Sequence, residues 1–364
     1  MSVLEERYRR WLRLLPASYR AEREEEMVSA FLEGARSGRA GHDDQHPRLL
    51  EIASVAALAL RLRLGGPGSP PGSYLWGESV RLAALLGLVF WTMIGSLYFG
   101  QAVLTYAVPA DALPDGVMGI GDAGSPERGR LVLAELSSLL WAAGLGALVS
   151  GRHRAAKAAA LAALVVPQVL VPPFAGGWDS AARWACSVLP AVVTVLALAL
   201  GHHRDAPPSR LPARRAVRVL AFPVAVGVLL AVVVGVLGAA TRAGAGPAGL
   251  LLQAWMWLDP TGLACLSLLG VTVWCVARRA SGRASGRAAV PQAPAAAILT
   301  VPVVLARAGT LPADMTGVIG LAATLQLVVL LACGLTLAAI GMRALRAAGG
   351  GPSAARGTRP ADAG

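Results

Sequence analysis

Charged residues are scarce in this sequence: they make up 15% of 364 residues, whereas a soluble domain usually carries about 25%. They are also unevenly spread, because apolar blocks about 20 residues long, the length that crosses a bilayer, recur after Ser79. This pattern argues against an ordinary soluble globular protein. It predicts an all-α, polytopic transmembrane bundle whose first partner is the lipid bilayer.

The sequence also lacks the motifs that carry common enzyme chemistry. It contains no Walker loop and no HExxH motif. It has no CxxC pair, no histidine-rich cluster and no metal-ligand spacing. We therefore expect a protein that is not an enzyme and that has no cofactor and no metal site.

Lysine and cysteine are rare as well. Lys157 is the only lysine among 33 basic residues, which outnumber 21 acidic ones and give a net charge of +12. Such a balance can indicate nucleic acid or an anionic membrane, but most arginines after Arg81 lie in short segments between apolar blocks. We therefore expect no direct contact with nucleic acid. The four cysteines all fall within apolar blocks and are interpreted as small core residues: Cys186, Cys265, Cys275 and Cys333.

The chain divides by composition into four parts. Residues 1–64 predict a small cytoplasmic domain of three amphipathic helices, and their charged start has no apolar signal-peptide region. Residues 65–78 are rich in glycine and proline and predict a linker. Residues 79–342 form the transmembrane domain, and residues 343–364 are expected to be a disordered cytoplasmic tail.

The transmembrane domain contains about eight apolar blocks. They lie near residues 80–106, 131–150, 158–174, 184–201, 219–240, 258–277, 291–306 and 315–341. The blocks containing Pro167 and Pro302 are short, so whether they span fully is left open. When the N-terminus is placed inside, all but five of the 33 basic residues fall in inner segments. The five outer ones are Arg128, Arg130, Arg183, Arg242 and Arg307. This count predicts a multi-pass protein of the cell (inner) membrane with both termini cytoplasmic.

Two ionisable residues lie within these blocks, and an intramembrane charge is a functional hypothesis by default. Glu135 is five residues into its block, so it could instead be an interfacial or packing carboxylate. Asp259 precedes Pro260, a spacing that favours a helix N-cap with proline at the first helical position. In that interpretation an interfacial helix near 246–257 ends just before a spanning helix.

Other polar and small residues have structural interpretations beside functional ones. The intramembrane amides Gln168, Gln253 and Gln326 are expected to hydrogen-bond neighbouring helices, with a substrate pathway as the alternative. His202, His203 and Asp205 are interpreted as a solvated inner loop. Small residues every four positions predict a helix-packing face, within the chain or in a membrane oligomer: Gly227, Ala231, Gly235 and Ala239.

The N-terminal segment resembles the helical prefix domains of bacterial multi-pass membrane proteins, namely the HAAS-type signalling domain and the permease prefix domain. Those domains combine a Leu-x-Pro turn, an aromatic-Arg pair and a Glu-Glu-Met helix. The matching residues are Leu14, Leu15, Pro16, Tyr19, Arg20, Glu25, Glu26 and Met27. The resemblance implies a cytoplasmic signalling or docking module, with Tyr19, Arg20, Glu25 and Glu26 as its candidate contact surface.

Two functions follow as hypotheses. The first is a non-enzymatic membrane sensor or regulator whose prefix docks a cytoplasmic regulatory protein. The second is a transporter or permease subunit, for which broken helices with paired polar groups near the midplane would be expected. The membrane region lacks the large extracytoplasmic insertion of permeases that carry such a prefix, which favours the first hypothesis.

Overall fold

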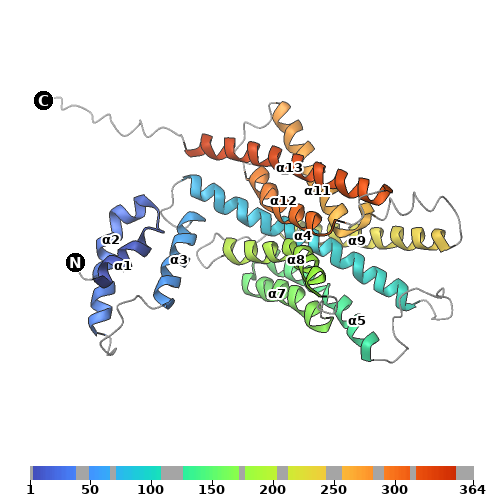
Figure 1. Ribbon diagram of the computed structural model, residues 1–364, viewed down its shortest axis with the longest axis horizontal. Coiled ribbons are helices and arrows are strands. Elements are labelled where there is room, and N and C mark those ends of the chain that lie inside the picture. The colour runs from blue at the N-terminus through green and yellow to red at the C-terminus, as the bar shows by residue number, and fades with distance from the viewer. Residues whose placement is uncertain are drawn as a thin grey trace. The chain divides into compact units, whose positions relative to one another are not determined.

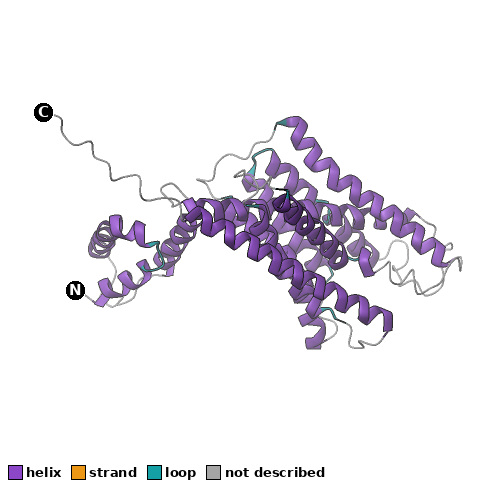
Figure 2. Ribbon diagram, turned by 90° about the horizontal axis from the view of Figure 1, so that it is seen from above, coloured by secondary structure: helices purple, strands orange, loops and turns teal. Residues whose placement is uncertain are grey.

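The computed structural model describes residues 3–37, 49–65, 71–107, 126–171, 177–202, 212–242, 256–281, 291–311 and 317–349. Within these ranges every regular element is a helix, as predicted (Figures 1 and 2). The chain forms two compact units, one containing Met1–Glu78 and the other Ser79–His202 and Pro207–Ala344. We call them the N-terminal unit and the membrane domain.

The N-terminal unit contains three helices, α1 (Val3–Leu12), α2 (Ala17–Ser37) and α3 (Leu49–Arg63). They bury a common apolar core, in which the ring of Tyr8 stacks on that of Phe31 with centroids 4.0 Å apart. A hydrogen bond from α3 stabilises the turn between α1 and α2: the guanidinium of Arg63 on α3 donates to the carbonyl oxygen of Leu14 at 3.0 Å. The amphipathic pattern of the first 64 residues therefore produces a unit with its own core.

The other described helices follow from residue 71 onward. They are α4 (Pro71–Ala107), α5 (Pro126–Ser137), α6 (Leu140–Val149), α7 (His153–Leu170), α8 (Gly177–Gly201), α9 (Ala213–Arg242), α11 (Pro260–Ala280), α12 (Gln292–Gly309) and α13 (Gly317–Gly349). Two boundaries differ from the composition-based ranges. Residues 71–78, placed in a linker, form the first turns of α4, because proline suits the first turn of a helix. Residues 343–349, placed in a disordered tail, continue α13.

Seven helical segments among the described residues are long and apolar enough to cross a bilayer. They are Ser73–Val103, Gly129–Val149, Ala181–Gly201, Ala213–Ala240, Pro260–Ala280, Gln292–Gly309 and Gly317–Ala347. The chain is thus a multi-pass integral membrane protein, and the exposed apolar faces of these helices contact lipid. Of the eight predicted blocks, only that at 158–174 is missing from this set, because its helix α7 begins with basic side chains.

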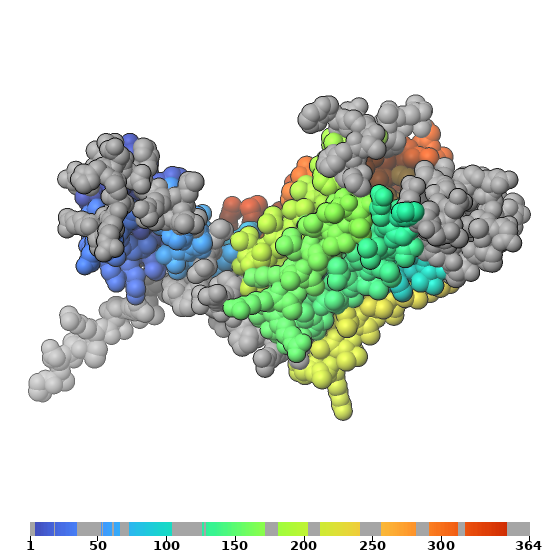
Figure 3. All heavy atoms as spheres, turned by 90° about the horizontal axis from the view of Figure 1, so that it is seen from below, coloured from blue at the N-terminus to red at the C-terminus, as the bar shows by residue number. Residues whose placement is uncertain are grey.

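Helix α7 nevertheless packs within the membrane domain. Gly151, at φ +79°, makes the tight turn that folds α7 back on α6, and a backbone conformation of this kind favours glycine. Figure 3 shows α7 (green) and α8 (yellow-green) side by side on one face of the membrane domain. Leu161, Val165 and Val169 of α7 are exposed.

The crossing of α9 over α4 depends on small residues. A Cβ atom on Gly227 of α9 would meet the backbone carbonyl oxygen of Met93 on α4 and would lie 2.7 Å from the Cβ of Ser96. Ala231, one turn further along, is 1% exposed and packs in the same apolar cluster. The predicted small-residue face is therefore a packing face within the chain at these two positions.

Replacing Gly227 with alanine is expected to lower the free energy of unfolding by about 1–3 kcal/mol, because the added methyl group meets backbone that cannot rotate away. Thermal unfolding in detergent, followed by tryptophan fluorescence, measures the effect. Gly238→Ala on the same helix is the matched control, since its Cβ would meet nothing within 4 Å. Alanine there should leave stability unchanged or raise it by up to about 1 kcal/mol. Equal losses in the two variants would contradict this account of the crossing.

Candidate functional site

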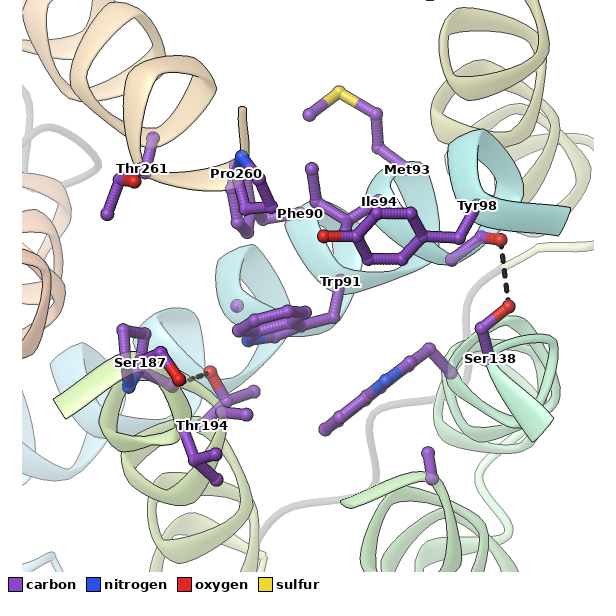
Figure 4. Close-up of a pocket in the computed structure, with 18 of the residues that line it drawn as sticks. Phe90, Trp91, Met93, Ile94, Tyr98, Ser138, Ser187, Thr194, Pro260 and Thr261 are labelled. Carbon is purple, nitrogen blue, oxygen red and sulfur yellow. Dashed lines mark hydrogen bonds between the residues drawn. The ribbon is translucent and has the colours of Figure 1, made fainter. Parts of the chain in front are cut away.

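The membrane domain contains a partly open cavity of about 920 Å³. Residues from eight helices line it: α4, α5, α6, α7, α8, α9, α11 and α12. Figure 4 shows aromatic side chains of α4 at its centre, with Pro260 and Thr261 of α11 on one side and Ser187 and Thr194 of α8 on another. Sites for drug-sized ligands have volumes of about 300–1,000 Å³, so this cavity is large enough to hold one.

Most of the cavity wall is apolar, and a few polar side chains interrupt it. Those polar side chains belong to Tyr98, Glu135, Ser138, Gln168, Ser187, Thr194, Thr261, Ser267 and Thr310. Glu135 is the only Asp, Glu, Lys, Arg or His among the described lining residues. The cavity therefore combines an apolar wall with a single acidic group among the described residues. Two of the residues predicted from sequence, Glu135 and Gln168, both line it.

Glu135 lies beside an interruption in its own spanning segment. Helix α5 ends at Ser137 and α6 begins at Leu140, so the segment Gly129–Val149 is broken in its interior. The hydroxyl of Ser138 donates to the carbonyl oxygens of Glu135, at 2.6 Å, and of Gly95 on α4, at 2.9 Å (Figure 4). A Cβ on Gly95 would lie only 2.5 Å from the carbonyl oxygen of Ser138, so glycine permits this approach. The break is thus fixed against α4.

Gln168 connects two walls of the cavity. The indole nitrogen of Trp184 on α8 donates a hydrogen bond of 2.7 Å to the Gln168 side-chain oxygen on α7. This is the contact between neighbouring helices that an intramembrane amide was expected to make. Its side-chain nitrogen makes no hydrogen bond to a described residue, so part of the amide could contact a ligand.

Aromatic rings form the middle of the cavity, a feature that the sequence analysis did not predict. Phe90, Trp91 and Tyr98 extend from α4, and Trp141 from α6. The rings of Trp91 and Trp141 stack with centroids 5.5 Å apart, and Phe90 meets Trp91 edge-on at 5.7 Å. The spacing of Trp91 and Tyr98, seven residues apart and therefore on one helical face, is the signal in the sequence that could have indicated this cluster.

Prolines surround the same cavity. Pro167, Pro190 and Pro223 lie inside α7, α8 and α9, and Pro260 begins α11; all four line the cavity. A proline inside a helix removes a backbone hydrogen bond and bends or weakens the helix there. The helices around the cavity are thus locally deformable where they face it. Pro302, the proline of the other short apolar block, lies inside α12 and does not line the cavity.

Asp259 and Gln326 belong to a second polar cluster. Asp259 caps α11, because its carboxylate accepts a hydrogen bond from the backbone N–H of Gly262, and Pro260 follows it as predicted. The carboxylate also lies 3.7 Å from the guanidinium of Arg307. Gln326 donates a hydrogen bond of 2.8 Å to the carbonyl oxygen of Met256. These contacts join α11, α12 and α13.

The position of Arg307 in the structure differs from the predicted one. The count of basic residues predicts an outer-loop position for Arg307, but this residue lies in the last turn of α12 and is 3% exposed. At this position its guanidinium pairs with the carboxylate of Asp259. Asp259 lies 48 residues earlier in the chain, so no local pattern indicates the pairing. Gln253 and most of the predicted interfacial helix lie outside the described residues, which resume at Met256.

In the N-terminal unit the four candidate docking residues separate into two groups. Tyr19 packs against the apolar core, and Arg20 is half-buried, so neither forms a fully exposed contact surface. Glu25 and Glu26 are exposed. The carboxylate of Glu25 accepts two hydrogen bonds from Arg9, of 2.8 and 3.0 Å, and this guanidinium lowers the pKa of Glu25.

The sequence predicts a solvated loop at His202, but this side chain is buried and only 5% exposed. Its ring lies 5.1 Å from that of His153, and Lys157 donates to the carbonyl oxygens of Ala199 and His202 at 3.0 and 2.8 Å. Burial, helped by the charges of His153, Arg81 and Lys157, lowers the pKa of His202 to about 4. His203 and Asp205 lie outside the described residues.

This environment predicts a loss of stability in mild acid. The unfolded chain binds a proton at His202 near pH 6.5, whereas the folded protein resists it until about pH 4, so the free energy of unfolding falls between these values as the pH drops. From pH 7 to 5 the expected loss is about 2 kcal/mol, at about 1.4 kcal/mol per pH unit. Chemical unfolding at several pH values measures it. His202→Gln should remove most of this dependence, and a profile unchanged by that substitution would contradict the assignment.

Among the described residues, no group of three or more His, Cys, Asp or Glu side chains is placed to hold a metal ion. The four cysteines are free, and three are buried, as predicted. What distinguishes the membrane domain chemically is therefore the cavity with its aromatic rings and its one carboxylate. No protein-family model, no curated protein and no solved structure matches this chain.

Proposed function

We propose that this integral membrane protein is a non-enzymatic sensor or regulator, whose N-terminal unit docks a soluble cytoplasmic protein. The observation that carries the proposal is the construction of that unit. It has its own apolar core, so it does not need the membrane domain to bury its apolar side chains. A domain that is built separately and is largely charged on its outside is suited to binding a second protein.

The outer face of α2 supplies a surface for such a contact. Glu22, Glu26 and Glu33 are exposed and lie at helical spacing on one side of α2. Glu25 is paired with Arg9, and Glu26 lies 4.0 Å from Arg23 in a pair whose two side chains are both exposed. An exposed pair of this kind is weak, so Glu22, Glu26 and Glu33 still form an acidic surface. A partner with basic groups on its surface would complement them electrostatically, which favours encounter and specificity.

A charge-reversal experiment tests the docking proposal. Full-length protein is purified from its native membranes, and soluble proteins that accompany it are identified and quantified. The variant Glu22→Lys/Glu26→Lys/Glu33→Lys should retain at least tenfold less of a specific partner. The variant Arg10→Glu/Arg13→Glu, changed at exposed positions at the end of α1 and just after it, should retain it fully. If both variants hold the same partner equally, or if no soluble protein accompanies the wild type, the proposal fails.

The same proposal places both termini in the cytoplasm. Helix α7 has 18 residues and would extend about 27 Å, close to the 30 Å of a bilayer core. The basic N-terminal end of α7 lies beside the C-terminal end of α8, where Lys157 donates hydrogen bonds to the carbonyl oxygens of Ala199 and His202. If α7 is counted with the seven other spanning segments, the chain crosses the membrane an even number of times. Its two ends then lie on the same side of the membrane. Protease digestion of intact cells should leave tags at both ends uncut.

A transporter is the second candidate, and the cavity favours it. A broken spanning segment beside a central cavity is a feature of transporters, and prolines at the cavity make the surrounding helices deformable. Ser187→Cys, made in a chain whose native cysteines are replaced with alanine, separates the two candidates. A transporter should expose this cysteine to impermeant thiol reagents from both sides of the membrane, whereas labelling from one side at most favours the sensor.

A further inference from the structure

The acidic side chain of the cavity has no basic partner among the described residues. Among the described residues, no basic side chain lies within 4.0 Å of the Glu135 carboxylate, and none lines the cavity. A carboxylate held in apolar surroundings is costly unless an opposite charge accompanies it. A positively charged ligand would supply that charge, whereas an anionic ligand would be repelled.

The aromatic rings favour the same kind of ligand. The faces of tryptophan, tyrosine and phenylalanine attract cations, each by about 0.5–2 kcal/mol and most strongly where water is excluded. Trp91, Trp141, Tyr98 and Phe90 all line the cavity that contains Glu135. The rings and the carboxylate therefore act on one volume.

The remaining wall determines what the rest of the ligand must be. Leucine, valine, alanine and proline side chains surround the aromatic cluster, and about 920 Å³ is far more than a metal ion or an ammonium ion would fill. Only a molecule with a bulky apolar body would replace the water in such a space at a gain in free energy.

We propose that this cavity binds an amphipathic organic cation, with the Glu135 carboxylate as its counter-charge and the Trp91, Trp141 and Tyr98 rings against its charged centre. The cation has the chemistry of a quaternary ammonium, a phosphonium or a protonated amine with aromatic or branched alkyl groups. The site is independent of docking at the N-terminal unit, and the ligand could be either the signal of a sensor or the cargo of a transporter.

Binding of tetraphenylphosphonium to the full-length protein in lipid nanodiscs tests the proposal, with empty nanodiscs subtracted for partition into lipid. Triphenylphosphine oxide, which is neutral and similarly apolar, is the comparison ligand. The cation should bind at least tenfold more tightly than the neutral compound. Its binding should also quench tryptophan fluorescence, and Trp91→Leu should reduce that quenching.

Variants at position 135 identify the counter-charge. Glu135→Gln should weaken cation binding at least tenfold and leave binding of the neutral compound unchanged, while Glu135→Asp should retain most of the preference for the cation. Glu78→Gln, at an exposed carboxylate outside the cavity, should behave as the wild type. Equal affinity for the two ligands, no binding of the cation, or full binding by Glu135→Gln would overturn the proposal. If Glu135→Gln does not fold, the Asp variant and the wild-type comparison of the two ligands decide the question.

Discussion

Replacing Asp259 with alanine is expected to lower the free energy of unfolding of the membrane domain by about 3–5 kcal/mol, the cost of leaving the buried guanidinium of Arg307 without its counter-charge. Two losses combine. Helix α11 loses the carboxylate that accepts the N–H of Gly262, and the guanidinium of Arg307 loses its counter-charge. The side chain of Arg307 is 4% exposed, and its Nε and one Nη atom already lack a hydrogen-bond partner. Titration with SDS from a mild detergent, followed by circular dichroism, measures the change.

The opposite substitution, Arg307→Met, should cost less. It leaves Asp259 with 31% of its side chain exposed and still bonded to Gly262 and to the hydroxyl of Thr261, at 3.1 Å. Methionine also fills part of the volume of the arginine. Arg343→Ala, at an exposed position on α13, serves as the control and should change stability by less than about 0.5 kcal/mol. A larger loss for Arg307→Met than for Asp259→Ala would show that the guanidinium, rather than the capping carboxylate, supports this junction.

Replacing Leu12 with alanine should unfold most of the N-terminal unit while the membrane domain stays folded. Leu12 is 0% exposed at the meeting point of α1, α2 and α3, where a leucine-to-alanine change costs about 2–5 kcal/mol. A unit of this size has only a few kcal/mol of stability to lose. Hydrogen exchange of the full-length protein should show faster exchange at the amides of α1 to α3 and unchanged exchange in α8 and α12.

Leu14→Ala is the matched control, because Leu14 is 38% exposed and contributes little to the core. Its exchange should resemble that of the wild type. If the Leu12 variant keeps its protection, the unit gains its stability from something other than its apolar core. If exchange rises in α8 and α12 as well, the two parts of the chain unfold together and the separate construction of the N-terminal unit is disproved.

Features that depend on near neighbours in the chain could be predicted from the sequence. The helical class and most of the spanning segments follow from apolar blocks, and the cap at Asp259 follows from its position directly before Pro260 and three residues before Gly262. The three helices of the N-terminal unit follow from amphipathic spacing. In each case the interactions that determine the structure join residues within one or two turns of a helix.

Features that depend on distant helices could not be predicted. The pairing of Asp259 with Arg307 and the burial of His202 require knowledge of which helix ends meet. The cavity is formed by helices whose order in space no pattern specifies, so Glu135 could not be assigned to it. The break between α5 and α6 had a local signal in the adjacent pair Ser137 and Ser138, since such pairs are common at kinks.

The contact of Lys157 with the end of α8 gives this protein a built-in reporter. Because the sequence has no other lysine, an amine-reactive ester can label the polypeptide only there and at a free amino terminus. The ammonium is held by two carbonyl oxygens, so it should react slowly while α7 and α8 stay together and faster when they separate. Mass spectrometry of a single acylated peptide would then follow movement between these two helices in native membranes, without any introduced probe.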